Sequence, residues 1–99
     1  MKFSIPTDFI AGLYDNFNCE LEDGEFTGKE CKELQTTLRV FEDIMDSQDG
    51  AALVEVEFGP VTERLFREYV AYHDEEFGSD PDYAESVVVL KAVLKTATP

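Results

Sequence analysis

A helix-capping signal directly before a long periodic run of apolar residues constrains the fold of this chain most strongly. Thr27 and Glu30 have the T-x-x-E spacing of a capping box, in which each side chain bonds the backbone N–H group of the other residue. The apolar residues that follow recur at steps of three and four: Cys31, Leu34, Leu38, Phe41 and Met45. The spacing predicts a helix from about residue 27 to about Asp46, followed by a turn over residues 47–50.

Two further helices are predicted from the same periodicity. Residues 8–17 carry apolar side chains on one helical face: Phe9, Ile10, Leu13, Tyr14 and Phe17. The segment 59–78 is also periodic, with Pro60 near its first turn and Gly78 as its stop. Between the first two helices, residues 19–26 are predicted to form an acidic loop, and alternation around Leu21 leaves a short strand open there.

Capping residues predict a fourth helix from Pro81 to about Lys95. Ser79 or Asp80 is placed to act as the N-cap, with Pro81 as the first helical residue. The valines at 87–89 favour a strand, but the apolar side chains make a continuous helical face: Tyr83, Ala84, Val87, Leu90, Val93 and Leu94. We therefore expect a helix.

The segment 51–58 changes from helical period to alternation. Val54, Val56 and Phe58 alternate with Glu55 and Glu57, which is typical of a half-buried strand or extended segment. Its candidate partners are residues 2–5 and the acidic segment 19–26, so any sheet is small. A helical interpretation of this segment stays open at this point.

The apolar content is sufficient for one core. The chain has 99 residues, of which 43% are hydrophobic, including eight Phe and four Tyr. A chain of this length forms one core rather than two. We expect a mainly α, compact single domain over residues 1–99, with about four helices and a minor β element; an α+β fold is the alternative.

The charge is the most unusual property of the composition. The chain carries 22 acidic and 8 basic residues, for a formal net charge of -14. A magnitude of about 2–8 is enough to keep a small domain soluble. Such a charge repels nucleic acid and anionic membranes and attracts basic protein surfaces. The expected partner is therefore a basic nucleic-acid-binding protein or nucleoprotein complex, with no direct binding of nucleic acid or membrane.

The sequence also predicts a cytoplasmic location. Its first residues lack the apolar stretch of a signal peptide, and no apolar run approaches the length of roughly 18 residues typical of a membrane span. Cys19 and Cys31 stand alone, without a C-x-x-C motif or a disulfide framework, which fits a reducing compartment. We expect both cysteines to be small buried side chains.

No motif for catalysis, cofactor binding or metal binding is evident. His73 is the sole histidine, and it is expected to be a surface or packing residue of the third helix. The segment 19–30 places Asp23, Gly24 and Glu30 in an EF-hand register, but Cys19 and Leu21 occupy its first and third ligand positions. We therefore expect no enzyme activity, no cofactor and no metal.

The acidic residues gather in patches, which are the candidate partner-binding sites. The first candidate surrounds the junction of the third and fourth helices: Asp74, Glu75, Glu76, Asp80 and Asp82. The second follows the first helix: Glu20, Glu22, Asp23 and Glu25. Glu85 lies around the same junction as the first candidate, and other acids cluster at Glu42, Asp43, Asp46 and Asp49 and at Glu55 and Glu57. Each patch alone is also compatible with an ordinary solvated face.

In size, acidity, small fold and absence of catalytic motifs, the chain resembles the small phage-encoded anti-CRISPR proteins and related DNA mimics. This resemblance covers the overall character of the chain. It implies a non-enzymatic inhibitor that occupies a Lys- and Arg-rich surface and blocks nucleic-acid binding, in the host cytoplasm. The alternative is an acidic interaction or regulatory module, monomeric or homodimeric, that binds through an apolar helix face: Leu34, Leu38, Phe41 and Met45.

Overall fold

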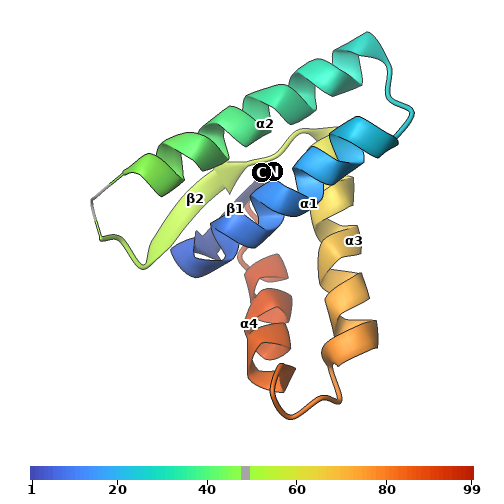
Figure 1. Ribbon diagram of the computed structural model, residues 1–99. Helices are drawn as coiled ribbons and strands as arrows, with labels where there is room; N and C mark the ends of the chain where they lie inside the picture. Colours follow the sequence, from blue (N-terminus) through green and yellow to red (C-terminus); the bar gives the residue numbers. More distant parts are fainter. Residues whose placement is uncertain (48–49) are drawn as a thin grey trace.

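The computed structural model describes residues 1–47 and 50–99 and shows a mainly helical domain with a small sheet (Figure 1). Its elements are β1 (Lys2–Pro6), the 3-10 helix η1 (Thr7–Phe9), α1 (Ile10–Asp23), α2 (Gly28–Asp46), β2 (Leu53–Glu57), α3 (Pro60–Phe77) and α4 (Ala84–Leu94). The predicted fold class is confirmed. The turn predicted over residues 47–50 lies partly outside the described residues.

The two strands pair antiparallel, with Phe3 opposite Val56 and Ile5 opposite Val54. The alternation in segment 51–58 therefore marks a strand, and its partner is the amino-terminal segment rather than residues 19–26. Phe3, Ile5 and Val56 are buried on one face, whereas Glu55 is exposed on the other. The carboxyl-terminal residues lie beside β1, where Lys2 and Thr98 form an isolated bridge.

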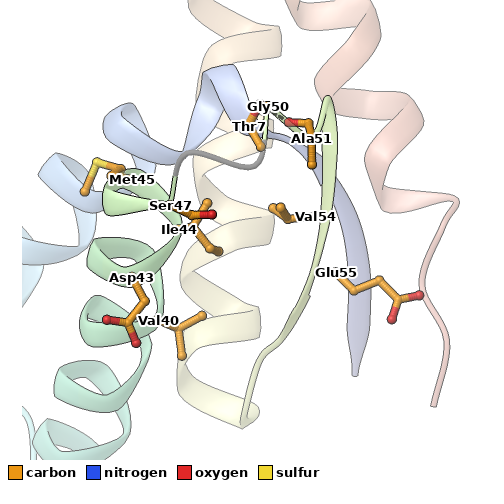
Figure 2. A pocket seen from close by; sticks show the side chains of 10 residues that line it. All are labelled: Thr7, Val40, Asp43, Ile44, Met45, Ser47, Gly50, Ala51, Val54 and Glu55. Atoms are coloured by element: carbon orange, nitrogen blue, oxygen red, sulfur yellow. Dashed lines mark hydrogen bonds between the residues drawn. The ribbon is translucent and has the colours of Figure 1, made fainter.

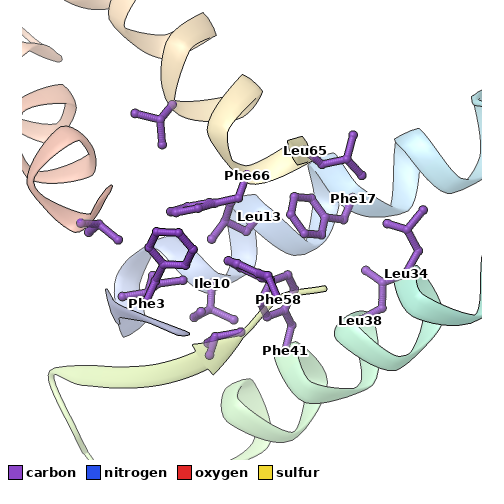
Figure 3. Close-up of a cluster of buried hydrophobic side chains, with 14 of the residues drawn as sticks. Phe3, Ile10, Leu13, Phe17, Leu34, Leu38, Phe41, Phe58, Leu65 and Phe66 are labelled. Atoms are coloured by element: carbon purple, nitrogen blue, oxygen red, sulfur yellow. The ribbon is translucent and has the colours of Figure 1, made fainter. Parts of the chain in front are cut away.

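Five fully buried phenylalanine rings join the sheet to three helices (Figure 3). Phe58, directly after β2, lies 6.2 Å from Phe41 of α2 and 5.2 Å from Phe66 of α3, measured between ring centroids. Phe17 of α1 is 5.5 Å from Phe41, and Phe3 of β1 is 5.2 Å from Phe66. Aromatic pairs at these separations add about 0.5–1.5 kcal/mol each to the free energy of burial. The high Phe content is thus used in the core.

Helix α2 begins as its capping signal predicts. The Thr27 Oγ1 atom accepts a hydrogen bond of 3.2 Å from the Glu30 N–H group, and a Glu30 carboxylate oxygen accepts one of 2.9 Å from the Thr27 N–H group. These bonds from Thr27, the one from its backbone most of all, hold the pKa of Glu30 below its usual value. The helix ends at Asp46, as predicted.

Helix α1 is longer than predicted, because residues 19–23 continue it instead of forming an acidic loop. Leu21 is half-buried against the core and extends the stripe of Leu13 and Phe17 at four-residue steps. The first turn, Thr7–Phe9, is a 3-10 helix, so the α-helix itself starts at Ile10. The apolar stripe therefore outweighs the acidic composition of this segment.

Helix α4 is shorter than predicted and starts at Ala84 rather than Pro81. An Asp80 carboxylate oxygen accepts a hydrogen bond of 2.9 Å from the Asp82 N–H group, and the Asp80 backbone oxygen accepts bonds from Tyr83 and Ala84. Asp80 thus stabilises a tight turn ahead of the helix rather than acting as its N-cap. Val87, Leu90 and Val93 are buried, so the predicted apolar face is confirmed at its centre.

Candidate acidic interface

The first acidic candidate forms one end of the hairpin of α3 and α4, and we call it the α3–α4 tip: Asp74, Glu75, Glu76, Asp80 and Asp82 (Figure 1). The first three lie in the last turn of α3, and the other two lie in the connection to α4. Asp80 is half-buried and the remaining four are exposed. Asp74 lies 3.4 Å from the Lys91 ammonium group. The other four form no ion pair with a described residue.

The second candidate lies at a different corner of the molecule, and we call it the α1–α2 tip: Glu20, Glu22, Asp23 and Glu25 (Figure 1). The first three end α1, and Glu25 lies in the connection to α2. Glu20 is half-buried and the others are exposed. Figure 1 shows this corner and the α3–α4 tip at separate extremities of a molecule that measures 40 × 32 × 25 Å. The two patches therefore do not form one continuous surface.

Further acids lie near the end of α2. Glu42, Asp43 and Asp46 are exposed near the end of α2. Glu42 accepts a hydrogen bond of 2.8 Å from the Tyr14 hydroxyl group, and this bond raises the pKa of Tyr14. Asp49 lies outside the described residues. The hydrogen bond from Tyr14 therefore joins this acidic end of α2 to α1.

The remaining predicted acids lie on β2 and in the first turn of α4. Glu55 and Glu57 are exposed on β2. Glu85 is exposed in the first turn of α4, where the helix dipole favours a negative charge. Glu85 therefore has a structural reason for its position.

Three helices carry carboxylates at their carbonyl ends, where the helix dipole makes a negative charge unfavourable. The carbonyl end of a helix carries partial negative charge, so an anion there is unfavourable and a cation is favourable. The last turns of α1, α2 and α3, which all lie in the described part of the chain, contain no basic residue. Helix α4, in contrast, has Lys91 in its last turn. The acidic helix ends therefore weaken the fold.

Few of the carboxylates are neutralised within the molecule. Over residues 1–47 and 50–99, the acidic partners in ion pairs are Glu63, Glu68 and Asp74. Two of these pairs, Arg64 with Glu68 and Arg67 with Glu63, join residues four apart on the surface of α3. Such exposed pairs contribute about 0.3–0.5 kcal/mol each. The negative field at the helix ends is consequently left open to a partner.

A cavity of about 300 Å³ lies between α3 and α4 near the α3–α4 tip. Its lining includes a continuous row of rings: Tyr69, His73, Phe77 and Tyr83. The His73 Nδ1 atom lies 2.9 Å from the Tyr69 backbone oxygen, and partial burial raises the pKa of the Tyr69 hydroxyl. This cavity could not be predicted from the sequence, because it depends on the packing of the two helices.

A larger groove of about 660 Å³ separates the end of α2 from β2 (Figure 2). Its apolar lining comes from Val40, Ile44 and Met45 of α2 and from Val54 of β2. Sequence reasoning missed this groove as well. The apolar residues that border the groove are the sequence feature from which it could have been inferred.

The apolar helix face considered as an alternative docking surface is part of the core. Leu34, Leu38 and Phe41 are 0%, 7% and 0% exposed. Met45, at 42%, is the one member of that face that a partner can reach within the described structure. Leu34, Leu38 and Phe41 therefore cannot form the docking face expected of an interaction module. The expectation for the cysteines also fails in part, because Cys19 is exposed and Cys31 is half-buried.

No cluster of three or more His, Cys, Asp or Glu side chains is arranged to hold a metal ion within residues 1–47 and 50–99. In the same part of the chain, each helix is too short or too polar to cross a bilayer. Comparisons with protein-family models, curated proteins and solved structures gave no match.

Proposed function

We propose that this protein is a non-enzymatic inhibitor of the DNA-mimic type, as the anti-CRISPR resemblance implies. Its acidic helix ends bind a Lys- and Arg-rich surface of a nucleic-acid-binding protein and exclude nucleic acid from it. One observation carries the proposal: α1, α2 and α3 all end on carboxylates, with no basic residue in the last turn of any of them. Because this arrangement costs stability, a benefit in binding explains it better than folding does.

The spacing of the charges supports an imitation of nucleic acid. Each strand of a duplex carries one phosphate per about 3.4 Å of helix axis. Carboxylates three or four residues apart on a helix lie roughly 5–6 Å apart, so they suit basic residues arranged for phosphates. At the α3–α4 tip the turn is rigid, because Pro81 fixes its own backbone and the Asp80 side chain bonds the Asp82 N–H group. A rigid anion array loses little entropy on binding.

The test compares charge reversal at the tip with the same reversal elsewhere. The protein is immobilised, and the nucleic-acid-binding proteins of a bacterial lysate, enriched on heparin, are passed over it and eluted with salt or with duplex DNA. The Asp80→Lys/Asp82→Lys variant changes the tip. The Asp8→Lys/Asp15→Lys variant makes the same charge change on exposed residues near the start of α1.

We expect a discrete basic protein to be retained, to be displaced by DNA and to bind less tightly as salt increases. The tip variant should lose it and the control variant should keep it. Equal loss in both variants would show that net charge alone causes retention. Retention that is insensitive to salt, DNA and tip reversal would refute the proposed function.

A further inference from the structure

The groove between α2 and β2 lies beside an open sheet edge. Antiparallel pairing alternates, so only every second residue of a strand directs its N–H and C=O groups toward its partner. The bonds from Phe58 to Met1 and from Thr7 to Ala52 fix which residues these are. On β2, Val54 and Val56 therefore face β1. Leu53, Glu55 and Glu57 direct their backbone groups to the opposite edge, where they bond no described residue.

The outer edge of β1 is closed by the chain itself. The Lys2 N–H group donates to Thr98 O at 2.8 Å, and the Thr98 N–H group donates to Lys2 O at 2.9 Å. The Ser4 N–H group donates to the Thr96 hydroxyl oxygen at 2.9 Å, and Pro6 has no N–H group. Because the outer edge of β1 is already bonded, the outer edge of β2 is the one at which another strand can be added.

Exposed apolar side chains border this open edge. Leu53 is 59% exposed, Met45 is 42% exposed and Val40 is 38% exposed. Val40 and Met45 line the groove together with Ile44 and Val54 (Figure 2). A strand added to β2 would direct alternate side chains into this apolar groove and the others toward solvent.

The charges on the open edge indicate which side chains an added strand would direct toward solvent. Glu55 and Glu57 are exposed on β2, and Figure 2 shows the Glu55 side chain pointing away from α2. Opposite charges on neighbouring strands attract, whereas like charges directly opposite each other are destabilising. A second copy of β2 would bring Glu55 and Glu57 against acidic residues of the same kind. A strand with Lys or Arg at these positions would neutralise them.

We propose that the open edge of β2 binds an extended segment of a partner protein in which apolar and basic residues alternate. The segment adds a third strand to the sheet, fills the groove with its apolar side chains and pairs its basic side chains with Glu55 and Glu57. This site borders the acidic end of α2, where Asp43 lines the groove, but it does not rest on the function proposed for the helix ends.

The probe is a synthetic peptide, Ac-KVRIKVR-NH2, labelled with a fluorophore and titrated with the protein by anisotropy. A peptide of the same composition with its basic and apolar residues in separate blocks is the control. Glu55→Pro removes one outward N–H group and leaves the bonds of Val54 and Val56 to β1 in place, as edge strands tolerate. Glu55→Gln changes the charge of that position and retains the N–H group. Thermal melting checks that both variants fold.

We expect Glu55→Pro to weaken binding at least about tenfold and Glu55→Gln to weaken it about threefold, with the block peptide binding more weakly than the alternating one. N-methylation of alternate peptide residues gives a test that needs no variant: one of the two methylation patterns should abolish binding and the other should not. Equal binding of both peptides, or no effect of either methylation pattern, would overturn the proposal. A dimer of the wild type that Glu55→Pro dissociates would also overturn it, because a second copy would then occupy the edge.

Discussion

The Glu33 carboxylate on α2 accepts a hydrogen bond of 2.6 Å from the Thr62 N–H group in the first turn of α3. Helix α3 begins after Gly59, which has no side chain to cap it. Glu33 therefore supplies from another helix the acceptor that an N-cap residue normally provides, and its charge complements the helix dipole. This bond couples the two longest helices through a pair 29 residues apart in sequence.

Removing this cap should lower stability. Glu33→Ala is expected to reduce the free energy of unfolding by about 1 kcal/mol, because the Thr62 N–H group loses its acceptor. Glu33→Gln keeps an acceptor oxygen and should cost less. Urea denaturation measures both, with Glu68→Gln on the exposed surface of α3 as the control. A loss no greater than that of the control would show that Glu33 does not cap α3.

A side chain at Gly59 should disturb the same bond. A Cβ atom there would lie 2.6 Å from the Glu33 carboxyl carbon, so the carboxylate must move, although the backbone angle φ of -81° suits alanine. We expect Gly59→Ala to destabilise the wild type and to cost clearly less in the Glu33→Ala background. A double-mutant cycle measures the difference. Strict additivity would mean that the two residues do not interact.

The sequence predicted those parts of the fold that local signals determine. The capping box at Thr27 and Glu30 fixed the start of α2, and the alternation around Val56 identified β2. The cap from Glu33 could not be predicted, because nothing near Thr62 in sequence marks it. The end of α1 was not predicted, because the acidic composition around Leu21 indicated a loop and its alternation a short strand, whereas Leu21 continues the apolar stripe of the helix.

The candidate sites were predictable in composition but not in arrangement. Exposure of the acidic clusters followed from their charge. Their separation at different corners depends on the paths of the connections between helices, which no local pattern determines. The open edge of β2 depends on which side of the strand β1 occupies, and that choice is made by the packing of the whole core.

The capping box predicts a specific dependence on pH. Thr27→Ala should lower the free energy of unfolding by about 1 kcal/mol at neutral pH. The bonds from Thr27 lower the pKa of Glu30 in the folded state, so the stabilisation by this carboxylate is present above the pKa of the unfolded chain. It is lost as the pH falls through the lowered folded value.

Urea titrations of the wild type and Glu30→Ala over that acid range measure this dependence. The stability difference between them should shrink as the pH falls. Glu25→Ala, at an exposed residue ahead of the cap, provides the control. A difference that stays constant down to strongly acid pH would contradict a role for the ionised Glu30 carboxylate.

Neutral substitutions at the helix ends should increase stability and reduce binding together. Asp23→Asn and Glu76→Gln each remove an anion from the carbonyl end of a helix, which should add about 0.3–1 kcal/mol at low ionic strength. Thermal melting measures this gain. Retention of the basic partner by the immobilised variants measures the loss. A gain in stability without any loss of binding would leave these two carboxylates outside the proposed interface.

Salt should stabilise this protein, because it screens the repulsion among carboxylates. With three acidic helix ends at about 0.3–1 kcal/mol each, the total is on the order of 1 kcal/mol or more, which corresponds to a rise in Tm of roughly 4–8 °C. We expect that rise between about 20 mM and about 500 mM NaCl. The Asp23→Asn/Glu76→Gln variant should respond less, because part of the repulsion is already removed. A Tm that is independent of NaCl, or that falls as NaCl increases, would mean that the helix-end carboxylates impose no cost on the fold, and the main argument for their role in binding would fail with it.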